Sequence, residues 1–252
     1  MAIKNLFFNI LLINILISYS ISIDKEYLIE YFKAFLQKNL SNKDLLKAIT
    51  LIRNLNTKTY EGNLEINLEN FEKNHMEKIR RNKGYIEDQY MYFDMNFGIK
   101  TIADSGCGII AVYNALYDLT GEENKNFPML IDYFEKNGIL LYGYFGTDPQ
   151  AVDEYFKELG FETMSSCEKE EYVYIQENCD AFVLTLYNDI DDIREMIHTL
   201  NISKKNGKYF IHNNSFNSQL REYDSILDIL EKINGGKSKD IYLTGIKNKI
   251  KN

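Results

Sequence analysis

The chain has 252 residues, which suffices for one sizeable hydrophobic core or for one domain with an additional arm. Hydrophobic residues make up 45% of the chain, with 19 Tyr and 15 Phe, and this content excludes intrinsic disorder. The formal net charge is -8 and no basic cluster is interleaved with aromatic residues, so nucleic acid is not expected as a partner.

The first 22 residues contain one early lysine, an apolar stretch from about 6 to 17 and small residues near the end. This order is typical of a secretory signal peptide or a membrane anchor, and it predicts a secreted or membrane-associated protein. The amides Asn9 and Asn14 inside the apolar stretch also fit an amphipathic helix packed on the domain. In that case the protein is cytoplasmic, and the two alternatives stay open.

Residues 23–95 are expected to form a helical arm or a propeptide-like segment. Apolar residues recur at helical spacing over 24–40 and again over 42–55, which predicts two amphipathic helices. Residues 56–95 are polar, charged and weakly periodic, so we expect a connecting arm there. His75 lies in this stretch and is expected to be a solvated surface residue.

Residues 96–252 show the alternation of elements typical of a folded domain. Ser105 is predicted to cap a helix from Cys107 to about Leu119, and a second helix is expected over about 128–136. A third helix begins at Pro149 after a cap at Thr147 or Asp148. It ends near Gly160.

The last part of the domain is rich in β-branched and aromatic residues. Strands are predicted at 161–166, 181–187, 198–203, 208–213 and 241–246. Helices followed by strands predict an α+β fold in which the helices pack on one side of a mostly antiparallel sheet.

Cys107 lies between Gly106 and Gly108 at the start of the first predicted helix of this domain. A thiol is nucleophilic as the thiolate, and the first turn of a helix lowers its pKa. The two glycines would leave the sulfur approachable, and nearby backbone N–H groups could stabilise an oxyanion. The alternative is a buried structural thiol, the ordinary role of a free cysteine. Cys167 and Cys179 are expected to be ordinary thiols.

A base for this thiol is predicted in the stretch HTLNISKKNGKYFIHNNSF. Asn206-Gly207 predicts a two-residue hairpin turn in which paired residue numbers sum to 413. This register places His198 diagonally across from Asn214, within reach of a hydrogen bond, whereas Asn213 would point to the opposite face. His212 is the rival base, and His198 could instead end an apolar helix.

The stretches SGCGIIAVYNAL, YGYFGTDPQAVDEYFKELGF and IHTLNISKKNGKYFIHNNSF resemble the papain-like cysteine peptidase superfamily. The likeness spans about residues 96–250 and is nearest to the bacterial double-glycine-leader peptidases. It implies a papain-like fold in which Cys107 is the nucleophile, His198 the base and Asn214 the residue that orients the imidazole. The order Asn214, Ser215, Phe216 is similar to the Asn-Ser-Trp stretch of that family.

One position departs from the family pattern. Such enzymes carry a Gln about six residues before the Cys as an oxyanion donor, and Thr101 stands there in this chain. Thr101 and Ser105 are the candidate replacements. Loss of one oxyanion donor typically costs roughly 10² to 10³ in rate.

The sequence therefore predicts a hydrolase that cleaves a peptide or isopeptide bond of a protein or peptide substrate through a Cys-His-Asn triad. Two alternatives remain: a cell-wall peptide amidase or acyl transferase with the same triad, and a catalytically inactive papain-like binding module. Three Cys without CxxC spacing and three His predict neither a metal site nor a cofactor.

Overall fold

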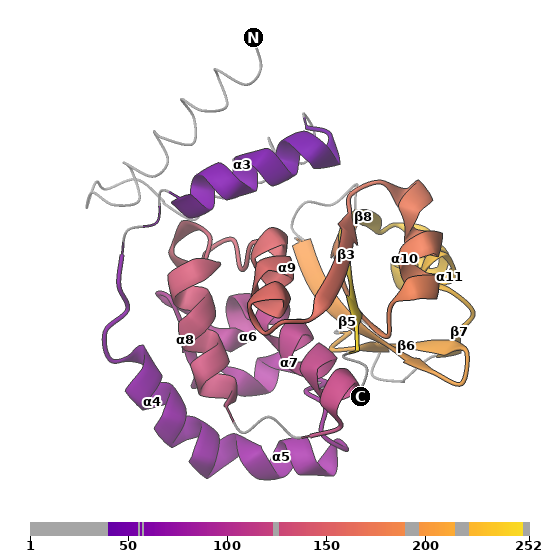
Figure 1. Ribbon diagram of the computed structural model, residues 1–252. Coiled ribbons are helices and arrows are strands. Elements are labelled where there is room, and N and C mark those ends of the chain that lie inside the picture. Colours follow the sequence, from indigo (N-terminus) through magenta and orange to yellow (C-terminus); the bar gives the residue numbers. More distant parts are fainter. Residues whose placement is uncertain are drawn as a thin grey trace.

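The computed structural model describes residues 40–54, 56, 58–122, 126–189, 197–214 and 222–248 (Figure 1). The predicted signal or anchor segment at 1–22 lies outside these residues, as does the predicted helix at 24–40 except for its last residue. None of the helices in the described part of the chain combines the length and the apolar character that a membrane crossing requires.

The helices predicted over 42–55 and beginning near Cys107, Pro128 and Pro149 are present, whereas the helices over 172–178 and 226–232 were not predicted. The α-helices are α3 (Asn42–Asn54), α4 (Asn63–Asn70), α5 (Met76–Arg81), α6 (Ile102–Ser105), α7 (Cys107–Thr120), α8 (Phe127–Asn137), α9 (Pro149–Glu158), α10 (Tyr172–Asn178) and α11 (Ile226–Lys232). Shorter helical turns are η1 (Phe71–His75), η2 (Gln89–Tyr92), η3 (Leu141–Gly143), η4 (Lys169–Glu171) and η6 (Ile233–Gly236).

The strands of the described residues form one six-stranded antiparallel sheet in the order β3-β8-β4-β5-β6-β7, besides the small pair β1-β2. All five predicted strands are present, and β7 is an additional short edge strand. The strands are β1 (Asn96–Phe97), β2 (Lys100–Thr101), β3 (Glu162–Ser166), β4 (Ala181–Tyr187), β5 (Ile197–Lys205), β6 (Lys208–His212), β7 (Glu222–Tyr223) and β8 (Lys239–Lys247).

The hairpin between β5 and β6 has the predicted register. Asn201 pairs with His212 and Lys205 pairs with Lys208, so paired numbers sum to 413. Asn206 and Gly207 form the turn, and both have positive φ values of 53° and 75°. That conformation is the one required by the tight turns that match the twist of paired strands.

Helices cover both faces of the sheet, which corrects the expectation of helices on one side. In Figure 1, α7, α8 and α9 lie on one side of the sheet, and α10 and α11 lie on the other. On the first side, Val183 of β4 belongs to the same core as Val112 of α7. On the second side, Leu184 packs with Ile175 of α10 and Ile229 of α11. Every residue of β4 is buried. Because successive side chains of a strand point to opposite faces, β4 contributes side chains to the core on each side of the sheet.

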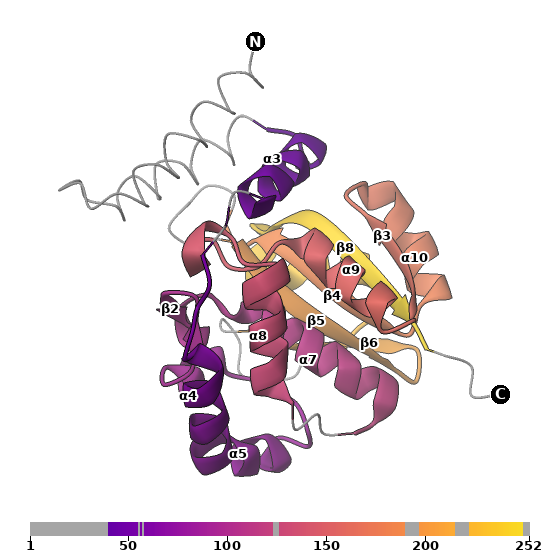
Figure 2. The same ribbon diagram turned by 60° about the vertical axis from the view of Figure 1, so that its left-hand side comes forward.

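Residues 58–95 are not a polar connecting arm, and this expectation was wrong. The segment contains α4, η1, α5 and η2, and Figure 2 shows α4 beside α8. Phe71, Ile86 and Met95 are buried in the same core as Val112. The widely spaced apolar residues of this segment therefore complete the core of the domain instead of joining two parts.

His75 is also buried, contrary to expectation. Its Nε2 lies 2.6 Å from Oδ1 of Asp94, and its ring stacks on Tyr92 with centroids 4.4 Å apart. Burial lowers the pKa of His75 more than Asp94 raises it.

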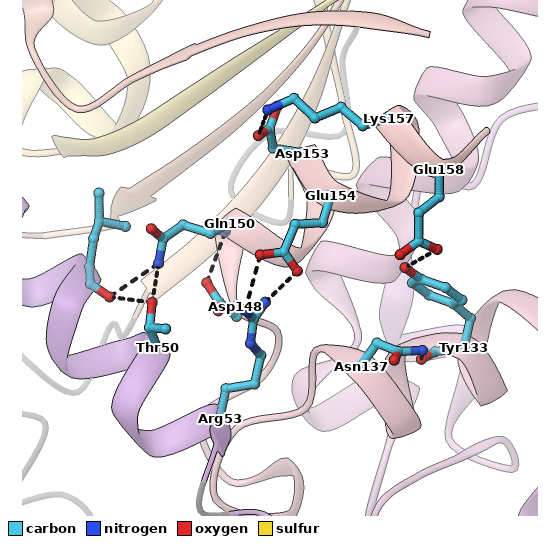
Figure 3. A network of polar contacts seen from close by, with 11 residues as sticks. Thr50, Arg53, Tyr133, Asn137, Asp148, Gln150, Asp153, Glu154, Lys157 and Glu158 are labelled. Atoms are coloured by element: carbon cyan, nitrogen blue, oxygen red, sulfur yellow. Dashed lines mark hydrogen bonds and ion pairs between the residues drawn. The ribbon is translucent and has the colours of Figure 1, made fainter. Parts of the chain in front are cut away.

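Helix α3 is held to α9 by the polar network in Figure 3. Arg53 donates to both carboxylate oxygens of Glu154 at 2.9 and 3.0 Å, and it lies 3.1 Å from the buried carboxylate of Asp148. Gln150 donates to the hydroxyl of Thr50 and to the carbonyl of Leu46. The apolar face of α3 packs on Leu140, Leu141 and Ile241, so α3 is an integral part of the fold.

Candidate active site

Cys107 is the first residue of α7, as predicted, and it is partly exposed. Ser105 does not cap α7, however, since it ends the preceding helix α6 and Gly106 precedes Cys107. Thr101 caps α6 instead, so the chain makes a separate helical turn immediately before the thiol. Cys107 keeps its place in the first turn of a helix with a strongly apolar sequence.

The thiol of Cys107 is hydrogen-bonded to the ring of His198. Backbone hydrogen bonds from Thr199 and Gly108 also reach the sulfur. Burial by itself raises the pKa of Cys107, but the hydrogen bond to His198 and the charge of that ring outweigh burial. The pKa of Cys107 is therefore lower than its ordinary value of 9.0.

His198 is the second residue of β5 and is buried. Burial lowers its pKa, yet the hydrogen bond and the charge interaction with Cys107 raise it more, so the pKa of His198 lies above 6.5. The opposite displacements in the two residues favour a thiolate beside an imidazolium. That is the protonation state in which a cysteine acts as a nucleophile and a histidine can return a proton.

The hydrogen-bond partner of Nε2 of His198 is the main-chain carbonyl oxygen of Asn213, at 2.8 Å. The predicted partner was the side-chain amide of Asn214. The ladder of β5 and β6 ends at the pair Asn201 and His212, because Asn213 has a left-handed φ of 59° and turns the chain away. Extrapolating the hairpin register by two residues therefore does not locate the bonding group, and the role of Asn214 stays a prediction.

Two residues far from Asn213 in the sequence form hydrogen bonds with it: Glu87, which precedes η2, and Gln89, the first residue of η2. Its side-chain oxygen accepts from the backbone N–H of Gln89 at 3.0 Å, and its amide nitrogen donates to the side-chain oxygen of Gln89 at 3.2 Å. The backbone N–H of Asn213 donates to Glu87 at 3.1 Å. Gln89 also donates to the carbonyl of Ala103, four residues before Cys107. Sequence reasoning missed both residues, because it treated their segment as a polar arm.

The two candidate oxyanion donors have other hydrogen bonds. Thr101 forms a capping box with Asp104, in which its hydroxyl donates to the carboxylate at 2.9 Å. The hydroxyl of Ser105 is 3.5 Å from the carbonyl of Thr101, which is long for a hydrogen bond between oxygens. Their part in catalysis stays a prediction. The backbone N–H of Gly108 already lies at the sulfur and is a donor at the helix start.

The glycines that flank Cys107 are required by packing. A Cβ at Gly108 would lie 2.9 Å from Cβ of Thr147, and a Cβ at Gly106 would lie 2.7 Å from a methyl carbon of Ile102. Both distances are shorter than real Cβ contacts. The glycines thus let the loop after η3 and the helix α6 pack closely against the start of α7.

The rival base His212 is held in a different set of contacts. Its Nδ1 is 2.6 Å from Oε1 of Glu87 and its Nε2 is 2.8 Å from the hydroxyl of Ser203. The other thiols contrast with Cys107. Burial raises the pKa of Cys179 to about 11, and burial with the charge of Glu168 raises the pKa of Cys167.

Comparison with known proteins adds no assignment: no protein-family model, no curated protein and no solved structure matches this chain. In the described part of the chain, no group of three or more His, Cys, Asp and Glu side chains is arranged to hold a metal ion.

Proposed function

We propose that the protein is a thiol-dependent hydrolase of the cysteine-peptidase type, acting on a peptide or isopeptide bond. The observation that carries this proposal is the contact between Cys107 and His198, with a pKa below the ordinary value for the thiol and above it for the imidazole. An ordinary structural thiol lacks such a partner, as Cys179 illustrates, and burial then raises its pKa.

The proposed reaction follows the usual course for a nucleophilic thiolate. The Cys107 sulfur attacks the carbonyl carbon, a C–S bond forms, and the carbonyl electron pair moves to oxygen. When the pair returns, the C–N bond breaks and the imidazolium of His198 gives its proton to the leaving amine. Water then attacks the thioester carbonyl carbon while the neutral imidazole takes a proton from it, so a C–O bond forms. The C–S bond breaks when the carbonyl re-forms, which releases the acid and restores the thiolate and the imidazolium.

In the proposed reaction, each ring nitrogen of His198 has its own function. The Nε2–H group donates to the carbonyl of Asn213, which holds the ring and leaves Nδ1 to exchange a proton with the thiol. The backbone N–H of Gly108 and the start of α7 supply positive electrostatic potential where the oxyanion would form. Asn214, Thr101 and Ser105 remain proposed contributors from the family resemblance.

The rate of thiol alkylation by iodoacetamide as a function of pH tests this proposal. At pH 6 we expect Cys107 to be labelled rapidly, while Cys167 and Cys179 of the same molecule react slowly and serve as internal controls. His198→Ala should reduce labelling of Cys107 at pH 6 by at least about tenfold, since one pKa unit changes the thiolate fraction tenfold. His75→Ala, at another buried histidine, is the matched control and should leave the rate unchanged.

Hydrolysis is measured separately with a library of internally quenched peptides and with Cys107→Ser as the inactive control. If Cys107 of the wild-type protein is labelled as slowly as Cys167, Cys107 is an ordinary thiol. This result would refute the proposal that the protein is a thiol-dependent hydrolase. Fast labelling without hydrolysis or acyl transfer on any peptide would favour the binding module that retains the fold.

A further inference from the structure

Glu87 binds two consecutive residues with its two carboxylate oxygens. Oε1 lies 2.6 Å from Nδ1 of His212, and Oε2 accepts the backbone N–H of Asn213 at 3.1 Å. These residues end β6 and begin the turn that carries the carbonyl bonded to His198. A single carboxylate therefore bridges the last paired residue of the strand and the first residue outside it.

Asn213 occupies a conformation that an isolated chain rarely adopts. Its φ of 59° lies in the left-handed region, which is unfavourable for residues other than glycine and least so for asparagine and aspartate. Such a conformation persists where surrounding contacts determine it, and it is found often at functional sites. The contacts here are the carboxylate of Glu87 on the main chain and Gln89 on the side chain.

Glu87 is in turn held by a buried aromatic and polar cluster. The ring of Tyr85 is stacked on that of His212, with centroids 3.8 Å apart and an angle of 4° between the planes. Ser203 bonds to the other ring nitrogen of His212. The hydrogen bonds from Ser203 to His212 and from His212 to Glu87 connect the same residue types as the triad of a serine hydrolase. Ser203 is 1% exposed and His212 is 2% exposed, however, so a substrate cannot reach the hydroxyl. The cluster is suited to holding Glu87 in place.

We propose that Glu87 is a positioning residue for the Cys107 and His198 site: it fixes the left-handed turn at Asn213 and so aims the Asn213 carbonyl at Nε2 of His198. This inference rests on the proposed function. The connection runs from Glu87 through the Asn213 main chain to His198 and then to the thiol. The segment before η2 therefore contributes a residue to the site, and residues 96–252 by themselves would lack it.

Glu87→Leu tests the proposal in the full-length protein. Leucine has no hydrogen-bonding group, so it loses the contacts to both His212 and Asn213, whereas glutamine could keep both by accepting from Asn213 with its oxygen and donating to Nδ1 of His212 with its amide nitrogen. Asp118→Leu is the matched control. Asp118 is another carboxylate next to this cluster, bonded to Tyr85 and Asn201 and not to Asn213.

The two measurements are the pH dependence of Cys107 alkylation and the exchange rate of the His198 Nε2 proton by NMR. Glu87→Leu should slow alkylation at pH 6 by about tenfold, which corresponds to one pKa unit, and should speed proton exchange. Asp118→Leu should change alkylation by less than about twofold. An unchanged profile and an unchanged exchange rate in folded Glu87→Leu would overturn the positioning role.

A second pair of variants serves if Glu87→Leu does not fold. Asn213→Gly and Asn213→Ala both remove the amide contacts to Gln89, but glycine accepts a positive φ and alanine does not. We expect Asn213→Gly to keep a protected Nε2 proton and Asn213→Ala to lose it, and equal behaviour of the two would refute the role of the turn. Wild-type Cys107 that titrates as an ordinary thiol would refute the hydrolase instead, whereas the NMR measurement tests the positioning role without requiring hydrolysis.

Discussion

Nε2 of His198 lies 2.8 Å from the main-chain carbonyl oxygen of Asn213, so the proposed base is oriented by the backbone. A carbonyl accepts and never donates, and this fixes the proton of the neutral imidazole on Nε2. Because the acceptor carries no side-chain charge, the imidazolium depends on the thiolate of Cys107 for its stabilisation. The two residues are therefore expected to titrate as a pair.

The activity of the pair should have a bell-shaped dependence on pH. The pKa of Cys107 is lowered, so the thiolate forms below pH 9.0, and the pKa of His198 is raised, so the imidazolium persists above 6.5. Peptide hydrolysis should increase along the acid limb and decrease along the alkaline limb. A single limb that rises near pH 9 would contradict an ion pair at this site.

The same displacements predict how stability changes with pH. The raised pKa of His198 contributes stability below 6.5 that is lost as pH rises through the folded-state value. The lowered pKa of Cys107 contributes stability above 9.0 that is lost as pH falls through its folded-state value. Both contributions should disappear in Cys107→Ser, which urea unfolding at several pH values would show by a flatter profile than that of the wild type.

Gly108→Ala should destabilise the protein although alanine is the better helix former. Replacing glycine by alanine inside a helix ordinarily gains about 0.5–1 kcal/mol, but here the new Cβ would lie 2.9 Å from Cβ of Thr147. Overpacking costs typically about 1–3 kcal/mol, so the free energy of unfolding should fall by about 1–2 kcal/mol. Urea unfolding measures this change. A gain in stability would mean that the Thr147 side chain moves away from the new Cβ at no cost in free energy.

Ile49→Ala tests whether α3 is part of the folded domain. Ile49 is 2% exposed and packs in the core formed with Leu140 and Ile241, so the substitution should cost about 2–5 kcal/mol. Leu51→Ala, on the same helix at 37% exposure, is the matched control and should cost about 0.5 kcal/mol or less. Equal small effects of the two variants in thermal unfolding would show that α3 is a detachable arm.

Asp148 should make the protein less stable as pH rises from about 4 to 6. Burial raises the pKa of Asp148 from 3.8 to about 6 despite the charge of Arg53, so the folded state binds its proton more tightly than the unfolded state. A displacement of about two units corresponds to about 2–3 kcal/mol lost across that interval. Asp148→Asn keeps a residue suited to the helix cap and should remove this dependence in urea unfolding. An equal slope in both proteins would assign the dependence to other groups.

Local patterns predicted most of the elements that carry the site. The start of α7 at Cys107 was readable because a long apolar run follows a polar loop. Asp148 and Pro149 predicted the start of α9, and the Asp148 side chain accepts from the N–H of Gln150 as a cap does. Asn206-Gly207 predicted the hairpin and its register correctly. Each of these features depends on residues adjacent in the sequence, so short-range physics suffices.

Other predictions failed where the deciding contact lies far away in the chain. Residues 58–95 are weakly periodic, because their buried side chains are widely spaced and join the core of α7 and α8 instead of forming one continuous apolar face. Helices α10 and α11 are short, so their seven-residue patterns are too brief to reveal helices on the second face of the sheet. The sequence alone thus predicted the α+β class, the antiparallel sheet and the helices on one face of the sheet. It did not predict the helices on the other face.

The amino-acid sequence by itself determined the nucleophile candidate, the strand that carries His198 and the hairpin that brings His198 near Asn213. The tertiary structure alone decided which atom holds the imidazole. That atom depends on a left-handed residue stabilised by Glu87 and Gln89, whose contacts span more than a hundred positions of sequence. The left-handed conformation of Asn213 is unfavourable for the residue itself and is imposed by contacts with the surrounding fold. A local sequence pattern therefore does not predict it.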